Sequence, residues 1–258
     1  MQNSLKLDLP HNWLHVHLPE TDSTMLQLRL PQYQHNDNEF VLVTTDYQTA
    51  GRGQRGNHWE AERGENLLFG FLFHPTMVPV THQFALSEAL ALAVRATLAE
   101  HAEDVTVKWP NDVYWRDNKI AGMLLEHDVC GTHIATTLTG VGLNVNQTIF
   151  ESDAPNPVSL KQITGHDCCR AELLTKLVVE FDNRYCMILR NDYDTLHTEY
   201  MEHLYRGCGS HVFEDAGGKF SASIEGVSPL GFLSLRKSNG DLCNYAFKEV
   251  AFCHDDRL

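Results

Sequence analysis

The chain has 258 residues, of which 43% are hydrophobic and 21% charged, and its formal net charge at pH 7 is −14. This length can bury a full core, the composition is that of a globular protein, and the negative charge argues against a general affinity for nucleic acid phosphates. The most apolar segment, Phe84–Ala99, is too short and too interrupted to span a bilayer, and seven cysteines without CxxC spacing fit reduced thiols better than disulfides or a zinc site. Because no signal-peptide pattern opens the chain, we expect a cytoplasmic protein with no membrane partner.

The first half of the chain predicts short strands and one long helix. Glu39–Thr45 is β-branched and apolar, and Asn66–Phe73 is a second apolar strand. Thr81–His101 is apolar nearly all round, which predicts a substantially buried helix. Val105–Trp109 is a short strand that stops at the turn Pro110–Asp112.

The next segment predicts a hairpin followed by helices. Ile120–Glu126 and Ile134–Asn146 are extended runs joined by a glycine turn. Apolar residues between Leu173 and Leu189 keep the spacing of an amphipathic helix, and Tyr193–Tyr205 predicts another. Since strands and helices alternate without a regular βαβ rhythm, we expect an α+β fold with a largely antiparallel mixed sheet.

The pattern of the sequence changes after Gly207. Short β-like runs are separated there by DAGGK, SPLG and SNGD, without helical periodicity. We therefore expect two domains, a core over residues 1–206 and a small β-barrel or sandwich over residues 207–258.

The segment Tyr47–Trp59, YQTAGRGQRGNHW, contains no acid, two arginines and three glycines. Its GxGxxG pattern lacks the following helix and acid of a dinucleotide-binding fold, and the chain has neither kinase motifs nor a GxxxxGK[ST] loop. Glycines let backbone N–H groups approach an anion, arginines neutralise it, and Trp59 offers a flat face to a ring. We interpret the segment as an anion-binding loop; a plain flexible loop is the alternative.

A second basic turn lies between Val107 and Glu126. Lys108 ends one strand, Lys119 begins the next, and Asp112 stands in the turn between them. The alternative is an ordinary turn with solvated lysines.

The segment Thr139–Asn146, TGVGLNVN, places Gly140 and Gly142 on one face of a strand, with Asn144 next on that face. Glycines inside a strand mark either the close approach of a ligand or backbone, or a bulge.

Four stretches together resemble the biotin protein ligase family: ETDST (Glu20–Thr24), YQTAGRGQRGNHW, KWPND…KIAGMLLE (Lys108–Glu126) and GVGLNVN (Gly140–Asn146). The similarity runs from about His15 to Phe252. It implies a catalytic domain related to class II aminoacyl-tRNA synthetases and a small SH3-like C-terminal barrel. Some members carry an N-terminal winged helix, but only about twenty residues precede ETDST, so we expect the ligase-only class.

The resemblance implies a two-step reaction. Biotin and ATP, with Mg²⁺ on the phosphates, give biotinyl-5′-AMP and pyrophosphate, and a lysine of a biotin carboxyl carrier domain then accepts the biotin. The partner is the carrier of a biotin-dependent carboxylase such as acetyl-CoA carboxylase; we expect no DNA partner, and a homodimer is possible. The alternatives are a lipoate or octanoyl ligase and a non-catalytic biotin-binding sensor.

The resemblance also implies roles for individual residues. The catalytic groups would be Lys119, Arg52 and Asp112. The biotin contacts would be Ser23, Thr24, Gln48, Arg52, Gly53, Gln54, Lys119, Gly122 and Leu124. The ATP or adenylate contacts would be Arg55, Asn57, Trp59, Lys108, Asn111, Gly142 and Asn144. No protein ligands for a metal are assigned.

Three positions depart from the family pattern. Met25 stands where Asn is usual, Gln54 where Arg is usual, and Asn57 where Arg is frequent. The first puts one biotin contact in doubt, and the other two reduce the positive charge over the intermediate.

A Gln54→Arg variant is expected to retain biotinyl-5′-AMP longer than the parent, because a charge-assisted hydrogen bond replaces a neutral one. The difference is roughly 1–2 kcal/mol, or about 5- to 30-fold in retention. Dissociation of the intermediate, followed by tryptophan fluorescence, measures it. Equal retention would make the substitution inconsequential and leave Arg55 as the better candidate for the contact.

Overall fold

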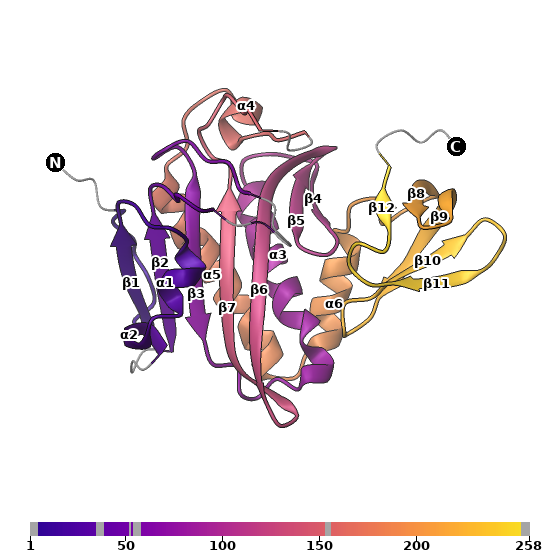
Figure 1. Cartoon of the computed structure of the whole chain (residues 1–258), viewed down its shortest axis with the longest axis horizontal. Helices are drawn as coiled ribbons and strands as arrows, with labels where there is room; N and C mark the ends of the chain where they lie inside the picture. The colour runs from indigo at the N-terminus through magenta and orange to yellow at the C-terminus, as the bar shows by residue number, and fades with distance from the viewer. Residues whose placement is uncertain (1–4, 35–38, 52, 54–57, 153–155, 254–258) are drawn as a thin grey trace.

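A seven-stranded sheet and a separate five-stranded sheet organise the computed structural model, which describes residues 5–34, 39–51, 53, 58–152 and 156–253 (Figure 1). The strands of the larger sheet are β1 (Trp13–Leu18), β2 (Phe40–Thr45), β3 (Leu67–Phe73), β4 (Val105–Lys108), β5 (Asp112–Trp115), β6 (Asn118–Cys130) and β7 (His133–Leu143). The helices are α1 (Thr24–Leu28), α2 (Pro31–Gln34), α3 (Phe84–Ala99), α4 (Leu160–Thr164), α5 (Arg170–Leu189) and α6 (Tyr193–Glu202), with a 3-10 turn η2 (Val80–His82) before α3. Within the described ranges no helix combines the length and the apolar character needed to cross a membrane.

The strand order of the larger sheet is β1-β2-β3-β7-β6-β5-β4. Strands β1 and β2 run parallel, and every other neighbouring pair is antiparallel. This arrangement confirms the expected α+β fold with a largely antiparallel sheet. The predicted hairpin is present as β6 and β7, with β6 longer than expected.

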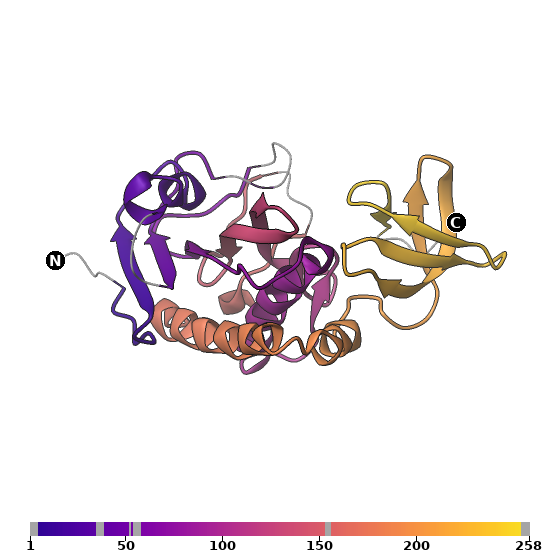
Figure 2. The ribbon, with the colours of Figure 1, turned by 90° about the horizontal axis from the view of Figure 1, so that it is seen from below.

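Helices cover both faces of this sheet (Figures 1 and 2). In Figure 2, α3 and α5 lie together along one face, and α1 lies on the other. The side chains of β2 alternate accordingly: Phe40 and Leu42 join the core under α3 and α5, whereas Val41 and Val43 pack with Leu28 of α1. A strand buried on both faces favours apolar residues at consecutive positions, which explains the run Phe40–Val43.

An aromatic cluster anchors the N-terminal strand to α5. The Trp13 ring stacks on Phe40 at 4.4 Å between ring centres, and Phe71 meets Phe181 at 4.7 Å. Full burial of such a side chain contributes on the order of 1.5–3 kcal/mol. The first strand is therefore held by packing as well as by its hydrogen bonds to β2.

Strand β5 and helix α4 are among the elements that the sequence analysis did not predict. Strand β5 lies between the turn at Asn111 and β6, where only a turn was expected, so β4, β5 and β6 form a three-stranded meander. Helix α4 has a capping box, in which Ser159 and Gln162 bond each other's backbone, and it ends on Gly165 at φ 82°. The S-x-x-Q and glycine signature could have revealed it.

The C-terminal strands are β8 (His211–Asp215), β9 (Gly218–Val227), β10 (Leu233–Lys237), β11 (Leu242–Tyr245) and β12 (Ala251–Phe252). They form a second antiparallel sheet, in the order β11-β10-β9-β8-β12. Hydrogen bonds join the loop between β9 and β10 to the core: Trp109 Nε1 donates to the Gly231 carbonyl at 2.9 Å, and the Phe84 amide donates to the Pro229 carbonyl at 3.2 Å. The described strands form a sheet in this order. Closure of the sheet into a barrel and a domain boundary at residue 206 remain predictions.

An Asp182→Asn variant is expected to raise the melting temperature above pH 6 by roughly 2–4 °C, equivalent to about 1 kcal/mol after allowance for partial solvent screening. Burial beside Trp13, whose indole N–H lies 3.2 Å from the carboxylate, raises the pKa of Asp182 to about 6. Ionisation of Asp182 therefore costs more free energy in the folded chain than in the unfolded chain. The resulting loss of stability is absent below the unfolded pKa near 4 and complete above pH 6. Asparagine keeps the acceptor without the charge.

Thermal unfolding of both proteins at pH 4 and pH 7.5 measures the effect, with the exposed Asp8→Asn as the matched control. A gain of equal size at both pH values would rule out the ionisation of Asp182 as its cause.

Candidate functional site

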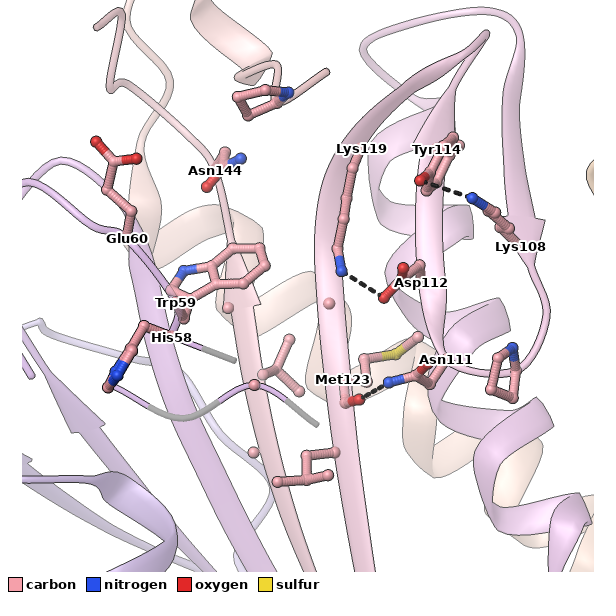
Figure 3. A pocket seen from close by; sticks show the side chains of 18 of the residues that line it. His58, Trp59, Glu60, Lys108, Asn111, Asp112, Tyr114, Lys119, Met123 and Asn144 are labelled. Atoms are coloured by element: carbon pink, nitrogen blue, oxygen red, sulfur yellow. Dashed lines mark hydrogen bonds and ion pairs between the residues drawn. The ribbon is translucent and has the colours of Figure 1, made fainter. Parts of the chain in front are cut away.

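A cavity of about 950 Å³ opens beside the strands β5, β6 and β7 (Figure 3). Every site residue predicted from the sequence that falls within the described ranges lines it: Ser23, Thr24, Gln48, Gly53, Trp59, Lys108, Asn111, Asp112, Lys119, Gly122, Leu124, Gly142 and Asn144. The predicted contacts at Arg52, Gln54, Arg55 and Asn57 lie outside the described residues. Segments more than a hundred residues apart in sequence thus meet at one cavity.

The start of α1 is tied to the glycine-rich segment by backbone and side-chain bonds. The Thr21 amide donates to the Tyr47 carbonyl at 3.1 Å, and the Thr49 amide donates back to Thr21 at 2.9 Å. The side-chain oxygen of Gln48 accepts from the Thr24 amide at 2.9 Å. This pairing holds the buried hydroxyls of Ser23 and Thr24 at the cavity wall.

Lys119 and Asp112 form an ion pair across β6 and β5. Their Nζ and Oδ1 atoms are 2.7 Å apart, and both side chains are between a fifth and a third exposed. Lys119 Nζ also lies 5.7 Å from the centre of the Trp59 ring. The backbone of Lys119 is bonded on both sides, because its amide donates to Asn156 and its carbonyl accepts from Val158. The cation is therefore fixed in place and still reachable from the cavity.

A flat glycine surface carries the Trp59 indole. Gly122 and Gly142 are directly paired across β6 and β7, and a Cβ built on either would lie 2.9 Å or 2.3 Å from the Trp59 ring. Next along β7, a Cβ on Gly140 would lie 2.8 Å from Met25 Cγ. The bare strand face predicted from the sequence is thus present, and two side chains of the protein itself lie on it.

Two buried polar atoms at the cavity have no hydrogen-bond partner among the described residues: Asn144 Oδ1 and Trp59 Nε1. The amide nitrogen of Asn144 donates to the Val158 carbonyl at 3.2 Å, which orients the side chain. Buried polar groups are nearly always paired in folded proteins. The wall can therefore offer one acceptor and one donor to a bound molecule.

A second amine, that of Lys108, lies on the other side of β5 (Figure 3). It donates to the Tyr114 hydroxyl at 2.9 Å and lies 4.4 Å and 5.3 Å from the ring centres of Tyr114 and Phe252. Burial lowers the pKa of Lys108 to about 8, and the positive charge of Lys119 adds to this against the opposing effect of Asp112. The two lysines of the basic turn thus have different surroundings.

Sequence reasoning missed Tyr114 and the C-terminal wall. Tyr114 follows Asp112 by two residues, so the alternation of β5 would have placed it on the same face had that strand been predicted. Val250, Ala251 and Phe252 reach the cavity from the second sheet, and no local sequence signal indicates this. Among the described residues no group of three or more His, Cys, Asp or Glu side chains converges as a metal site.

The match to a family model and the matches to individual relatives agree with one another. A model of the biotin/lipoate A/B protein ligase family matches residues 18–144. The bifunctional ligase/repressor BirA of Bacillus spizizenii is 27% identical over 212 residues, which are 80% of this chain and 64% of that protein. The biotin–[acetyl-CoA-carboxylase] ligase of Paracoccus denitrificans is 28% identical, with 86% of this chain and 94% of that protein covered. This chain thus spans less than two thirds of the bifunctional relative.

Among solved structures, the biotin protein ligase of Aquifex aeolicus in complex with biotin and ATP is similar, with a TM-score of 0.77 and 25% identity. The match covers 93% of this chain and 99% of that one, so it includes the second sheet as well as the core.

A Gly142→Ala variant is expected to displace the Trp59 indole and to red-shift its fluorescence, because the added methyl group would stand 2.3 Å from the ring. The same substitution in a Trp59→Phe background should leave the emission of the other tryptophans unchanged. Gly226→Ala in β9 is the matched control, since nothing lies within 4 Å of its Cβ position. An unshifted spectrum in Gly142→Ala would show that Trp59 does not rest on this strand pair.

Proposed function

Because the chain belongs to the biotin/lipoate A/B protein ligase family, we propose that it is a biotin protein ligase. It would activate biotin with ATP to biotinyl-5′-AMP and pass the biotin to a lysine of the carrier domain of a biotin-dependent carboxylase. The observation that carries this proposal is the fixed Lys119–Asp112 pair, which faces the same cavity as Trp59 and the start of α1.

The first step brings two anions together, the biotin carboxylate and the α-phosphate of ATP. A cation fixed in place lowers the energy of that approach without reorganising during the reaction. Lys119 has this property, because its backbone is bonded on both sides and its amine is held by Asp112. Arg52 and Arg55, which lie outside the described residues, are proposed to add positive charge.

The remaining wall supports binding of the two substrates. Ser23, Thr24 and Gln48 provide hydroxyl and amide groups for the ureido ring of biotin. Asn144 Oδ1 provides an unpaired acceptor for a donor on the nucleotide, and the Trp59 ring provides a stacking surface. Mg²⁺ would enter on the phosphates of ATP, as part of that substrate.

The second step needs an uncharged lysine amine beside the acyl-adenylate. Asp112 lies at the cavity wall with one carboxylate oxygen on Lys119, so it can orient an incoming ammonium group. The C-terminal sheet, proposed to be an SH3-like barrel over residues 207–258, closes the wall on the side of the second amine. We propose that this chain has no DNA partner and that it can form a homodimer.

A lipoate or octanoyl ligase is the second candidate, because Met25 lies over Gly140 where an apolar acyl chain could pack. Incubation with ATP, a biotin carboxyl carrier domain and either biotin, lipoate or octanoate separates the candidates. Biotin-dependent modification of the carrier lysine is expected, and absence of any acyl-adenylate would leave a non-catalytic binding protein.

A Lys119→Ala variant is expected to reduce biotin-dependent ATP–pyrophosphate exchange by on the order of 10²-fold or more, because a positioned cation is lost where two anions meet. Asp112 loses its ion-pair partner in this variant, but its carboxylate is partly exposed to water. The fold should therefore be kept, and the circular dichroism spectrum should not change. The matched control is Lys161→Ala, which removes a surface ion pair with Asp167. Exchange at the parental rate in a folded Lys119→Ala protein would remove this residue from the mechanism.

A further inference from the structure

The surroundings of Lys108 suggest a task that a simple support for the turn would not need. Its amine reaches the cavity wall, donates to the Tyr114 hydroxyl, and is flanked by the rings of Tyr114, Phe252 and, at 5.9 Å, Tyr205. Within the described part of the chain, no carboxylate forms an ion pair with it. Lys119, in contrast, is paired with Asp112 at 2.7 Å.

This difference separates the two amines chemically. A lysine that is flanked by rings and partly withdrawn from water gives up its proton more readily than a lysine in water. The charged groups that act on Lys108 are Asp112, Lys119, Arg206 and Asp117. The two cations oppose its charge and the two acids favour it, and burial is the largest influence.

We propose that Lys108 is the proton acceptor for the incoming carrier lysine in the transfer step. The ring of Phe252 in β12 would favour the uncharged form of the Lys108 amine, which is the form that can accept a proton. This inference rests on the proposed function. The geometry assigns the two lysines complementary tasks at one cavity wall: Lys119, paired with Asp112, holds anions, while Lys108 exchanges a proton.

The transfer step moves two protons and exchanges one bond for another. The carrier ammonium loses one proton to the neutral amine of Lys108. The free amine then attacks the acyl carbon of biotinyl-5′-AMP, forming the C–N bond as the C–O bond to the phosphate breaks. The second proton leaves the nitrogen with the departing AMP phosphate or to water, and Lys108 returns its proton to solvent before the next cycle.

The shifted pKa is consistent with this task. An amine with a pKa of about 8 carries about 200- to 300-fold more of its neutral form at pH 7 than an ordinary lysine. A base is most effective when its pKa lies near the working pH. Carrier transfer should therefore rise with pH and level off near pH 8.

The test is single-turnover transfer from preformed, enzyme-bound biotinyl-5′-AMP, normalised to the amount of intermediate. Two acceptors are compared: the carrier domain, whose lysine must lose a proton, and hydroxylamine, which is uncharged at neutral pH. In Lys108→Arg the ratio of carrier transfer to hydroxylamine transfer should fall by about 10²-fold, and the plateau near pH 8 should disappear. A purely structural defect would lower both rates together.

Phe252→Leu provides a second measurement, which decides the matter if Lys108→Arg does not fold. Loss of one ring admits water to the amine, so the midpoint of the pH profile should move to higher pH. An unchanged ratio with an unchanged profile in Lys108→Arg, or an unmoved midpoint in Phe252→Leu, would overturn the assignment. Failure of the parent protein to form biotinyl-5′-AMP at all would instead overturn the proposed function.

Discussion

The contact between Trp59 and the Gly122–Gly142 pair is the constraint on which the geometry of the site depends. Two strands of a central sheet would normally present side chains to the cavity, and any Cβ at these two positions would collide with the indole. Their absence lets an aromatic ring lie directly on the backbone of β6 and β7. The centre of the ring in turn lies 5.7 Å from Lys119 Nζ.

The site holds two lysines at one cavity wall within a protein that is acidic overall. A chain with a net charge of −14 repels anionic substrates on average, so any anion-binding function needs cations held in place by other bonds. Lys119 is held by its backbone bonds and by Asp112. Lys108 is held by an aromatic hydroxyl and by rings, and the low polarity of that environment is what lowers its pKa.

The second sheet takes part in the site as well as in the fold. Trp109, next to Lys108, bonds the Gly231 carbonyl, and Phe252 lies beside the Lys108 amine. A shift of this sheet would therefore change both the packing of the basic turn and the hydration of one lysine. Packing between the two parts of the chain and the chemistry of the site are coupled through the same few residues.

The sequence alone was enough to predict the glycines on one face of Gly140–Asn146, the hairpin and the long helices, because these depend on local spacing. Through the family motifs it also pointed to those predicted site residues within the described ranges that line the cavity. It also placed Asp112 in the short connection that leads to Lys119, although strand β5, which holds Asp112 beside β6, was not predicted. Only the tertiary structure decided which side chain packs at each of these places: Trp59 on Gly142, Met25 on Gly140 and Phe252 beside Lys108. Periodicity reports which side of an element is buried, but the segment that buries it comes from elsewhere in the chain, and the free energy that selects it arises only when distant surfaces meet.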